Sequence, residues 1–212
     1  YQQSASKGYE ADGLLYLKSG SKEQNILAKQ GDDLRIDWGY FYMVAGKENT
    51  AYSVGNSTEL RKNFVNGTLN SASLEGEDSN GNMALVRSHG KVKNVTDKIM
   101  LGYDDIYSIQ YFGTNLRPYW NSKGDRTIEA EMLAAYNEYD KLLARCYAFD
   151  KKLMEDASAA GGKEYAELCA LAYRQSIAAH KLVEAPNGDL LWLSKENNSN
   201  GCINTVDLTY PS

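Results

Sequence analysis

The chain has 212 residues, of which 42% are apolar and 24% are charged, and its formal net charge at pH 7 is −5. This composition is typical of a folded, water-soluble protein with room for two modest domains, so it excludes a disordered chain and a fibrous repeat. The negative charge and the lack of a basic run exclude nucleic acid as an expected partner. No stretch holds the roughly 18 apolar residues that a membrane span needs.

From residue 11 to residue 122 the pattern predicts an antiparallel sheet with no helix between its strands. The strongest segment is DLRIDWGYFYMVA, residues 33–45, in which alternate residues form one apolar or aromatic face. This predicted face consists of Leu34, Ile36, Trp38, Tyr40, Tyr42 and Val44. Weaker strands are expected at residues 13–18, 51–54 and 84–95.

The segment DKIMLGYDDIYSIQYFG, residues 97–113, predicts a second strong strand. Ile99, Leu101 and Tyr103 share one side, and the adjacent acidic residues Asp104 and Asp105 indicate a bend or bulge. Residues 80–81, Asn-Gly, predict a hairpin turn because both residues tolerate positive φ. Many short strands of this kind favour an antiparallel β-sandwich.

Residues 125–183 instead show apolar residues at spacings of three and four, which predicts helices. A long helix is expected after Asp125, its N-cap, as far as Gly161 and Gly162, since glycine ends helices at little steric cost. A second helix is expected from Lys163 to about Val183, so that the pair forms an αα-hairpin. The predicted class is α+β, with a β-sandwich domain at 1–124 and a helical domain at 125–212.

One helical hairpin cannot by itself form a domain, because each helix has a broad apolar stripe that one sheet covers only in part. We therefore expect further helices that this sequence does not contain, so the chain looks like a fragment. Exposed helix faces of this kind also favour self-association.

The C-terminal segment SKENNSNGCINTVDLTYPS, residues 194–212, is the candidate site. Glu196 and Asp207 could act as paired carboxylates, one donating and one accepting a proton. Lys195 or Tyr210 could stabilise an oxyanion, and the asparagines Asn197 and Asn200 could hold an amide or a hydroxyl group. The alternative is a solvated turn.

No metal or cofactor is predicted. The acidic group at residues 32–37 lacks the glycine and the terminal glutamate of a calcium loop, and the cysteines lack the pairing of a structural zinc site.

Four stretches, KEQNILAKQGDDLRIDWGYFYMVA, IMLGYDDIYSIQYFGTNLRPYW, LAYRQSIAAHKLV and LWLSKENNSNGCINTVDLTYPS, together resemble the glutaminase A-like family. The resemblance implies a β-sandwich region followed by a six-hairpin α/α toroid, similar to that of several glycoside hydrolases. It also implies hydrolysis of glutamine to glutamate and ammonia, and an extracellular or periplasmic location. The site-lining residues it implies are Lys195, Glu196, Asn197, Asn200, Asp207 and Tyr210.

Three functions stay open at this stage. The first is a fragment of an amidohydrolase with a small-molecule substrate, glutamine, in which case the fragment alone is expected to be inactive. The second is a glycoside hydrolase-like enzyme, because two carboxylates beside an aromatic wall suit an oxocarbenium-like transition state. The third is a non-catalytic module that binds carbohydrate or supports the helical domain.

Overall fold

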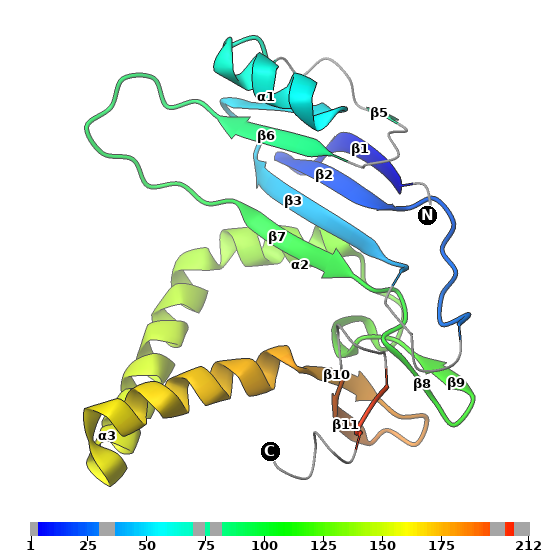
Figure 1. Ribbon diagram of the computed structural model, residues 1–212, viewed down its shortest axis with the longest axis vertical. Helices are drawn as coiled ribbons and strands as arrows, with labels where there is room; N and C mark the ends of the chain where they lie inside the picture. Colours follow the sequence, from blue (N-terminus) through cyan, green and yellow to red (C-terminus); the bar gives the residue numbers. More distant parts are fainter. Residues whose placement is uncertain (1–3, 30–36, 70–74, 77–81, 196–201, 206–212) are drawn as a thin grey trace. The chain divides into compact units, whose positions relative to one another are not determined.

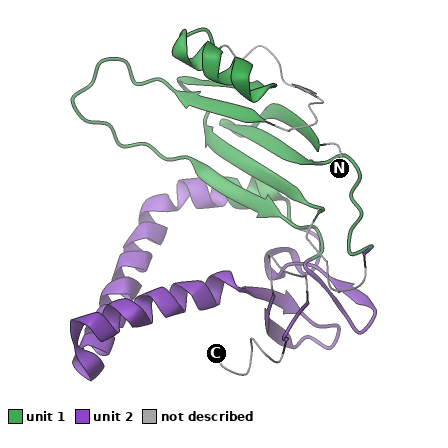
Figure 2. Cartoon of the chain, viewed as in Figure 1, with its two compact units in different colours: residues 1–28, 37–107, 126–133 green, residues 29–36, 108–125, 134–212 purple. Residues whose placement is uncertain are grey.

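The computed structural model describes residues 4–29, 37–69, 75–76, 82–195 and 202–205 of the chain. These residues belong to two compact units, which Figure 2 colours separately. Unit 1 comprises residues 1–28, 37–107 and 126–133, and unit 2 comprises residues 29–36, 108–125 and 134–212. Helices accompany sheets whose described strand pairs are all antiparallel, which confirms the predicted α+β class. The division into domains at residue 124 stays a prediction.

Unit 1 is built on a five-stranded sheet with the strand order β5-β1-β2-β3-β7 (Figure 1). The strands are β1 (Ser4–Ala11), β2 (Leu14–Ser21), β3 (Tyr40–Gly46), β5 (Glu75–Gly76) and β7 (Met100–Asp104). Asp12 and Gly13, both at positive φ, close the hairpin between β1 and β2, as a two-residue turn of this type requires. The sheet therefore begins at Ser4, earlier than the alternation from residue 11 predicted.

A second layer, the antiparallel pair of β4 (Thr50–Val54) and β6 (Met83–Arg87), packs on one face of this sheet. The core between the layers holds Leu15, Leu17, Tyr52 and Val54, with Met43, Met83 and Leu85 at its edge. Two antiparallel layers with their apolar faces together are the arrangement that the predicted sandwich requires.

The expectation that no helix interrupts the strands is wrong. Helix α1 (Ser57–Val65) follows β4, and the side chain of Asn56 caps it by accepting a hydrogen bond from the Thr58 N–H at 2.9 Å. A second, single-turn helix, η1 (Tyr119–Asn121), follows the last strand of that half. Leu60 is the buried residue of α1, so the helix presents too little apolar periodicity for sequence analysis to detect.

The first turns of helix α2 (Ile128–Asn137) pack on the opposite face of the large sheet, within unit 1. The Tyr9 hydroxyl donates to a Glu129 carboxylate oxygen at 2.5 Å, and the Tyr16 hydroxyl donates to the Glu129 carbonyl oxygen at 3.2 Å. Thr127, and not the predicted Asp125, caps the helix, because its hydroxyl accepts from the Ala130 N–H.

Strand β7 leaves its more apolar side largely exposed to solvent. Leu101 and Tyr103 are 67% and 46% exposed, whereas Gly102 lies against the side chain of Met132 on α2. The helix needs the space that a glycine leaves, so the side of Gly102, and not the more apolar side, faces it. The predicted bend after Asp104 is confirmed, because Ile106 takes a positive φ of 57° before the next strand begins.

Unit 2 holds two small hairpins, β8 (Ile109–Tyr111) with β9 (Thr114–Leu116) and β10 (His180–Glu184) with β11 (Leu190–Ser194). Their shared core is Ile109, Leu116 and Val183, surrounded by Tyr111, Leu191, Leu193 and Ile203. An isolated bridge between Pro118 and Val183 adds to this packing.

Helix α3 (Tyr139–Ala178) makes up most of the rest of unit 2. Gly162, at a φ of 83°, splits it into two arms (Figure 1), and the rings of Phe149 and Tyr173 meet across the arms at 5.2 Å. The predicted αα-hairpin is therefore confirmed. A break at Glu138 separates α2 from α3, so the first predicted helix is not continuous.

The second predicted helix ends earlier than expected. It stops at Ala178, and residues 180–184 form β10, whereas the sequence predicted helix as far as Val183. Pairing of this segment with β11, through a turn that contains Gly188 at a φ of 90°, overrides its helical pattern.

An ion pair at the end of β6 predicts a pH-dependent stability. Arg87 donates to both carboxylate oxygens of Asp97, at 2.6 and 3.0 Å, and these bonds hold the pKa of Asp97 below its usual range. A carboxyl group whose pKa falls on folding stabilises the folded chain above its unfolded pKa, and this contribution is lost as the pH falls through the folded pKa. Asp97→Asn should therefore lower the free energy of unfolding by about 1 kcal/mol at neutral pH, a modest value because the pair is partly solvated.

Urea unfolding of both proteins from neutral to acid pH measures this difference. The gap should close once the pH lies below the folded pKa of Asp97. A gap that stays constant down to pH values where Asp97 is protonated contradicts the prediction.

Candidate functional site

The structure describes one of the six predicted site residues, Lys195. Glu196, Asn197 and Asn200 lie in residues 196–201, and Asp207 and Tyr210 lie in residues 206–212, which are outside the described residues. The pairing of Glu196 with Asp207 therefore stays a prediction.

Lys195 directly follows β11 and is 5% exposed. Its ammonium group donates to the Ser108 carbonyl oxygen at 2.8 Å, and its backbone N–H donates to the Ala179 carbonyl oxygen at 2.8 Å. A buried ammonium group is stable only where hydrogen bonds replace its water. Lys195 is thus a fixed point at the start of the polar segment.

Two residues in the middle of the polar segment, Ile203 and Asn204, are tied to the same place. Lys195 forms a β-bridge with Ile203, and Asn204 and Ser194 exchange two hydrogen bonds, each at 3.0 Å. Described residues on either side of 196–201 are therefore bonded to one another at the end of the β10–β11 hairpin.

Ser108, which contacts the Lys195 side chain, adjoins a packed core. Ser108 is 1% exposed, and its N–H donates to the Leu116 carbonyl oxygen at 2.8 Å, which extends the β8–β9 ladder. Ile109 and Val183 lie in the adjoining core. Sequence analysis missed Ser108, because its contribution is a backbone carbonyl and no local pattern marks it.

Replacement of Lys195 by Met should lower the free energy of unfolding of the chain. The change keeps most of the buried stem but removes the ammonium group, which leaves the Ser108 carbonyl without that donor, and a loss of about 1–3 kcal/mol in the free energy of unfolding is expected. Urea unfolding measures it, with Lys163→Met as the matched control, because the Lys163 side chain is 84% exposed. Equal stability of the two variants would contradict a structural role for the buried ammonium group.

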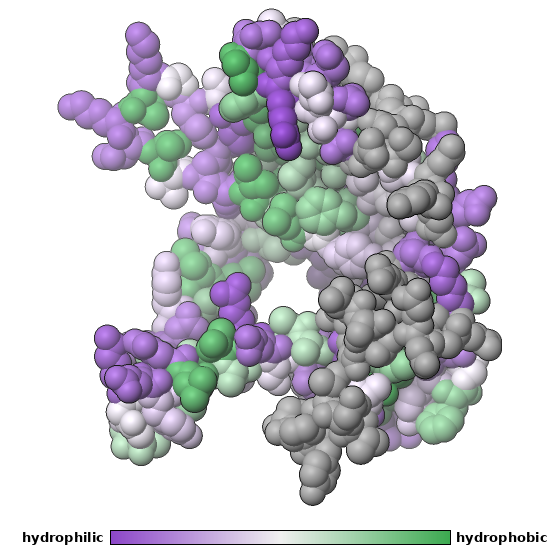
Figure 3. Space-filling view, in the orientation of Figure 1, coloured by the Kyte–Doolittle hydropathy of each residue, from purple (hydrophilic) through white to green (hydrophobic). Residues whose placement is uncertain are grey.

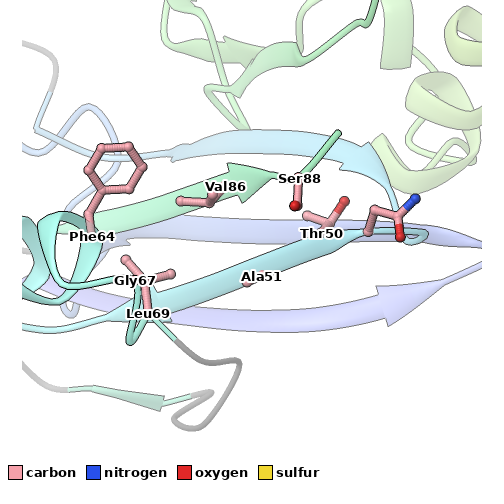
Figure 4. A pocket seen from close by; sticks show the side chains of 8 residues that line it. Thr50, Ala51, Phe64, Gly67, Leu69, Val86 and Ser88 are labelled. Atoms are coloured by element: carbon pink, nitrogen blue, oxygen red, sulfur yellow. The ribbon is translucent and has the colours of Figure 1, made fainter. Parts of the chain in front are cut away.

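A pocket of about 450 Å³ lies in unit 1, beside the β4–β6 strand pair and the end of α1 (Figure 4). Phe64, Leu69 and Val86 form its apolar part, and Asn49, Thr50 and Ser88 form its polar part. None of its eight lining residues carries an acid or a base, so these residues offer hydrogen bonds and apolar contacts but no proton transfer.

A wider groove of about 1100 Å³ runs between the two arms of α3. Leu142, Phe149, Leu153 and Ile177 are among its lining residues. Leu168 and Leu171, elsewhere on the second arm, are 62% and 53% exposed, and Figure 3 shows apolar side chains among hydrophilic ones in this helical part. Self-association through these faces stays a prediction.

Within the described ranges, no three His, Cys, Asp or Glu side chains converge as a metal site would require. Among the residues that the structure describes, no helix has both the length and the hydropathy of a membrane span.

Two curated fungal proteins are similar to the chain. Glutaminase A of Aspergillus oryzae is 27% identical over 97% of the chain, and the protein named "Probable glutaminase" of Arthroderma benhamiae is 25% identical over 93% of it. The chain spans 31% and 25% of the lengths of these relatives. No solved structure matches the chain.

Two family profiles cover nearly all of the sequence. Residues 2–156 match a domain of unknown function, DUF5127, and residues 162–212 match the glutaminase A six helical-hairpin domain. The second match begins at Gly162, where α3 turns, and includes the candidate site segment. From both profiles and both relatives, the chain belongs to the glutaminase A-like family.

Proposed function

We propose that the chain is part of an enzyme that hydrolyses the side-chain amide of glutamine to glutamate and ammonia. The observation that carries this proposal is that the polar segment at residues 194–212 lies inside the match to the glutaminase A six helical-hairpin domain. The similarity to the Aspergillus oryzae glutaminase A along 97% of the chain supports it.

In the proposed reaction, Glu196 or Asp207 takes a proton from the attacking water as general base. The C–N bond then breaks as a carboxylic acid returns a proton to the amide nitrogen, which leaves as ammonia. Tyr210 or Lys195 stabilises the tetrahedral oxyanion, and Asn197 and Asn200 hold the polar groups of the substrate. The bond from the Lys195 ammonium group to the Ser108 carbonyl favours Tyr210 as the oxyanion donor and gives Lys195 a positioning role.

The test is ammonia release from glutamine by the natural protein that contains this chain. Release of ammonia, without reducing sugar from an oligosaccharide panel, is the expected result. Sugar release without ammonia would instead support a glycoside hydrolase, and neither product would support a non-catalytic module. We expect the 212-residue chain alone to be inactive, so turnover by the purified chain contradicts that part of the proposal.

We also propose an extracellular or periplasmic location, which the resemblance to the family supports. Fractionation of the source cells tests it, and recovery of the protein with cytoplasmic markers contradicts it.

A further inference from the structure

Two lysines lie side by side on the face of the large sheet that α2 partly covers. Lys7 on β1 and Lys18 on β2 are direct cross-strand partners, and Lys18 is in turn the partner of Tyr42 on β3. Like charges directly opposite each other destabilise a sheet. A nearby negative charge would therefore offset the repulsion between the two ammonium groups.

Tyrosine rings lie beside both ammonium groups. The Lys18 Nζ lies 3.6 Å from the centroid of the Tyr40 ring and 5.6 Å from that of Tyr42, and the Lys7 Nζ lies 5.5 Å from that of Tyr9. Burial, followed by the charge of Lys7, lowers the pKa of Lys18. Ring faces attract a cation but leave its N–H donors without oxygen acceptors.

The acidic groups near this cluster are held by other donors. Glu129 accepts from the Tyr9 hydroxyl, and Asp104 accepts from the Ile106 N–H at 2.9 Å. Among the described side chains, no carboxylate lies within ion-pair distance of Lys7 or Lys18. Glu75 on β5 is the cross-strand partner of Lys7 on its other side.

Tyr42 adds a hydroxyl donor on a largely buried side chain. It is 2% exposed, and its hydroxyl has no hydrogen-bond partner among the described residues. Burial, and next the charge of Glu129, raises the pKa of Tyr42, so the phenol stays protonated at neutral pH. The hydroxyl is not sealed from solvent, so it can donate to the oxygen of a bound ligand.

We propose that Lys7, Lys18 and the Tyr42 hydroxyl form a binding site for the carboxylate of a small organic acid. The charges favour a monoanion, because Glu129 and Asp104 already offset part of the two positive charges and a dianion would leave an excess of negative charge. The exposed parts of the tyrosine rings suit the ring of a sugar acid. This site is separate from the proposed glutaminase residues and does not depend on that function.

The test compares galacturonate with galactose, which lacks the carboxylate, by calorimetric titration of the full chain at constant ionic strength. Saturable binding of galacturonate, with galactose at least about tenfold weaker, is expected, since charge-assisted hydrogen bonds to two ammonium groups are lost with the carboxylate. Equal binding of the two sugars, or no saturable binding of galacturonate, overturns the proposal. Tighter binding of inorganic phosphate than of galacturonate overturns the monoanion assignment.

Variants separate this site from general charge effects. Lys18→Met keeps the stem over Tyr40 and should weaken the binding of galacturonate about tenfold. Tyr42→Phe removes a hydroxyl with no partner among the described residues, so it should weaken binding without loss of thermal stability. Lys47→Met is the matched control, because Lys47 pairs with Glu10 and lies outside the proposed site. This variant should bind galacturonate with unchanged affinity. Circular dichroism checks that each variant folds. Folded Lys18→Met with wild-type affinity overturns the assignment.

Discussion

Replacing Glu196 by Gln or Asp207 by Asn in the natural protein should lower kcat for glutamine hydrolysis by about two to four orders of magnitude for the residue that acts as general base. Each change keeps the shape of the side chain and removes its ability to accept a proton from water. KM should change little where the carboxylate acts on water and not on the bound substrate. Steady-state ammonia release measures both constants.

The matched control for these variants is Asp189→Asn. Asp189 lies in the turn between β10 and β11, on the same small hairpin, and its carboxylate accepts a hydrogen bond from the Asn187 side chain at 2.7 Å. Its replacement should leave kcat within about twofold of the wild type, as is usual for a surface change away from the site. Wild-type kcat in both the Glu196 and the Asp207 variants would show that neither is the base.

Gly39→Ala should destabilise the folded chain by about 3 kcal/mol or more. Gly39 has a φ of 89°, and a Cβ atom there would lie 2.6 Å from the Asp104 carbonyl oxygen and 3.0 Å from the Asp105 Cα. Both neighbours are backbone atoms at the end of β7, so they cannot rotate away as a side chain could. The expected result is a lower free energy of unfolding in urea.

Gly13→Ala separates the cost of a positive φ from the cost of the steric clash with the end of β7. Gly13 has a similar φ of 79°, but nothing lies within 4 Å of a Cβ atom built there. In that variant, the free energy of unfolding should fall only by the cost of placing alanine at positive φ, about 1–2 kcal/mol. Equal losses at the two positions would mean that the strand end moves to make room, contrary to the prediction for Gly39.

Sequence periodicity predicted the elements whose pattern is set by their own residues. In β3, Tyr42 and Val44 are buried on the predicted face, because a strand in the middle of a sheet must bury one parity. The reversal of the chain between the two helical arms occurs at Gly162, as the glycine pair indicated. The bend after Asp104 was equally local.

The features that sequence analysis missed depend on partners far away in the chain. Residues 180–184 become a strand because residues 190–194 pair with them, and the face of β7 is decided by Met132 on α2. The support of the candidate site is harder still to predict, because Lys195 reaches a backbone carbonyl 87 positions earlier. Glu196 and Asp207, the residues with the clearest chemical signal, lie outside the described residues.

Helix α2 has a practical consequence for anyone who dissects the protein. Its residues up to 133 belong to unit 1. There Glu129 accepts a hydrogen bond from Tyr9, and Met132 packs against Gly102. A recombinant sheet region cut at residue 124, where the sequence pattern changes, would lose both contacts and expose the phenol of Tyr9 to water. A boundary at residue 133 keeps them, although it falls within a helix, where truncation is ordinarily avoided.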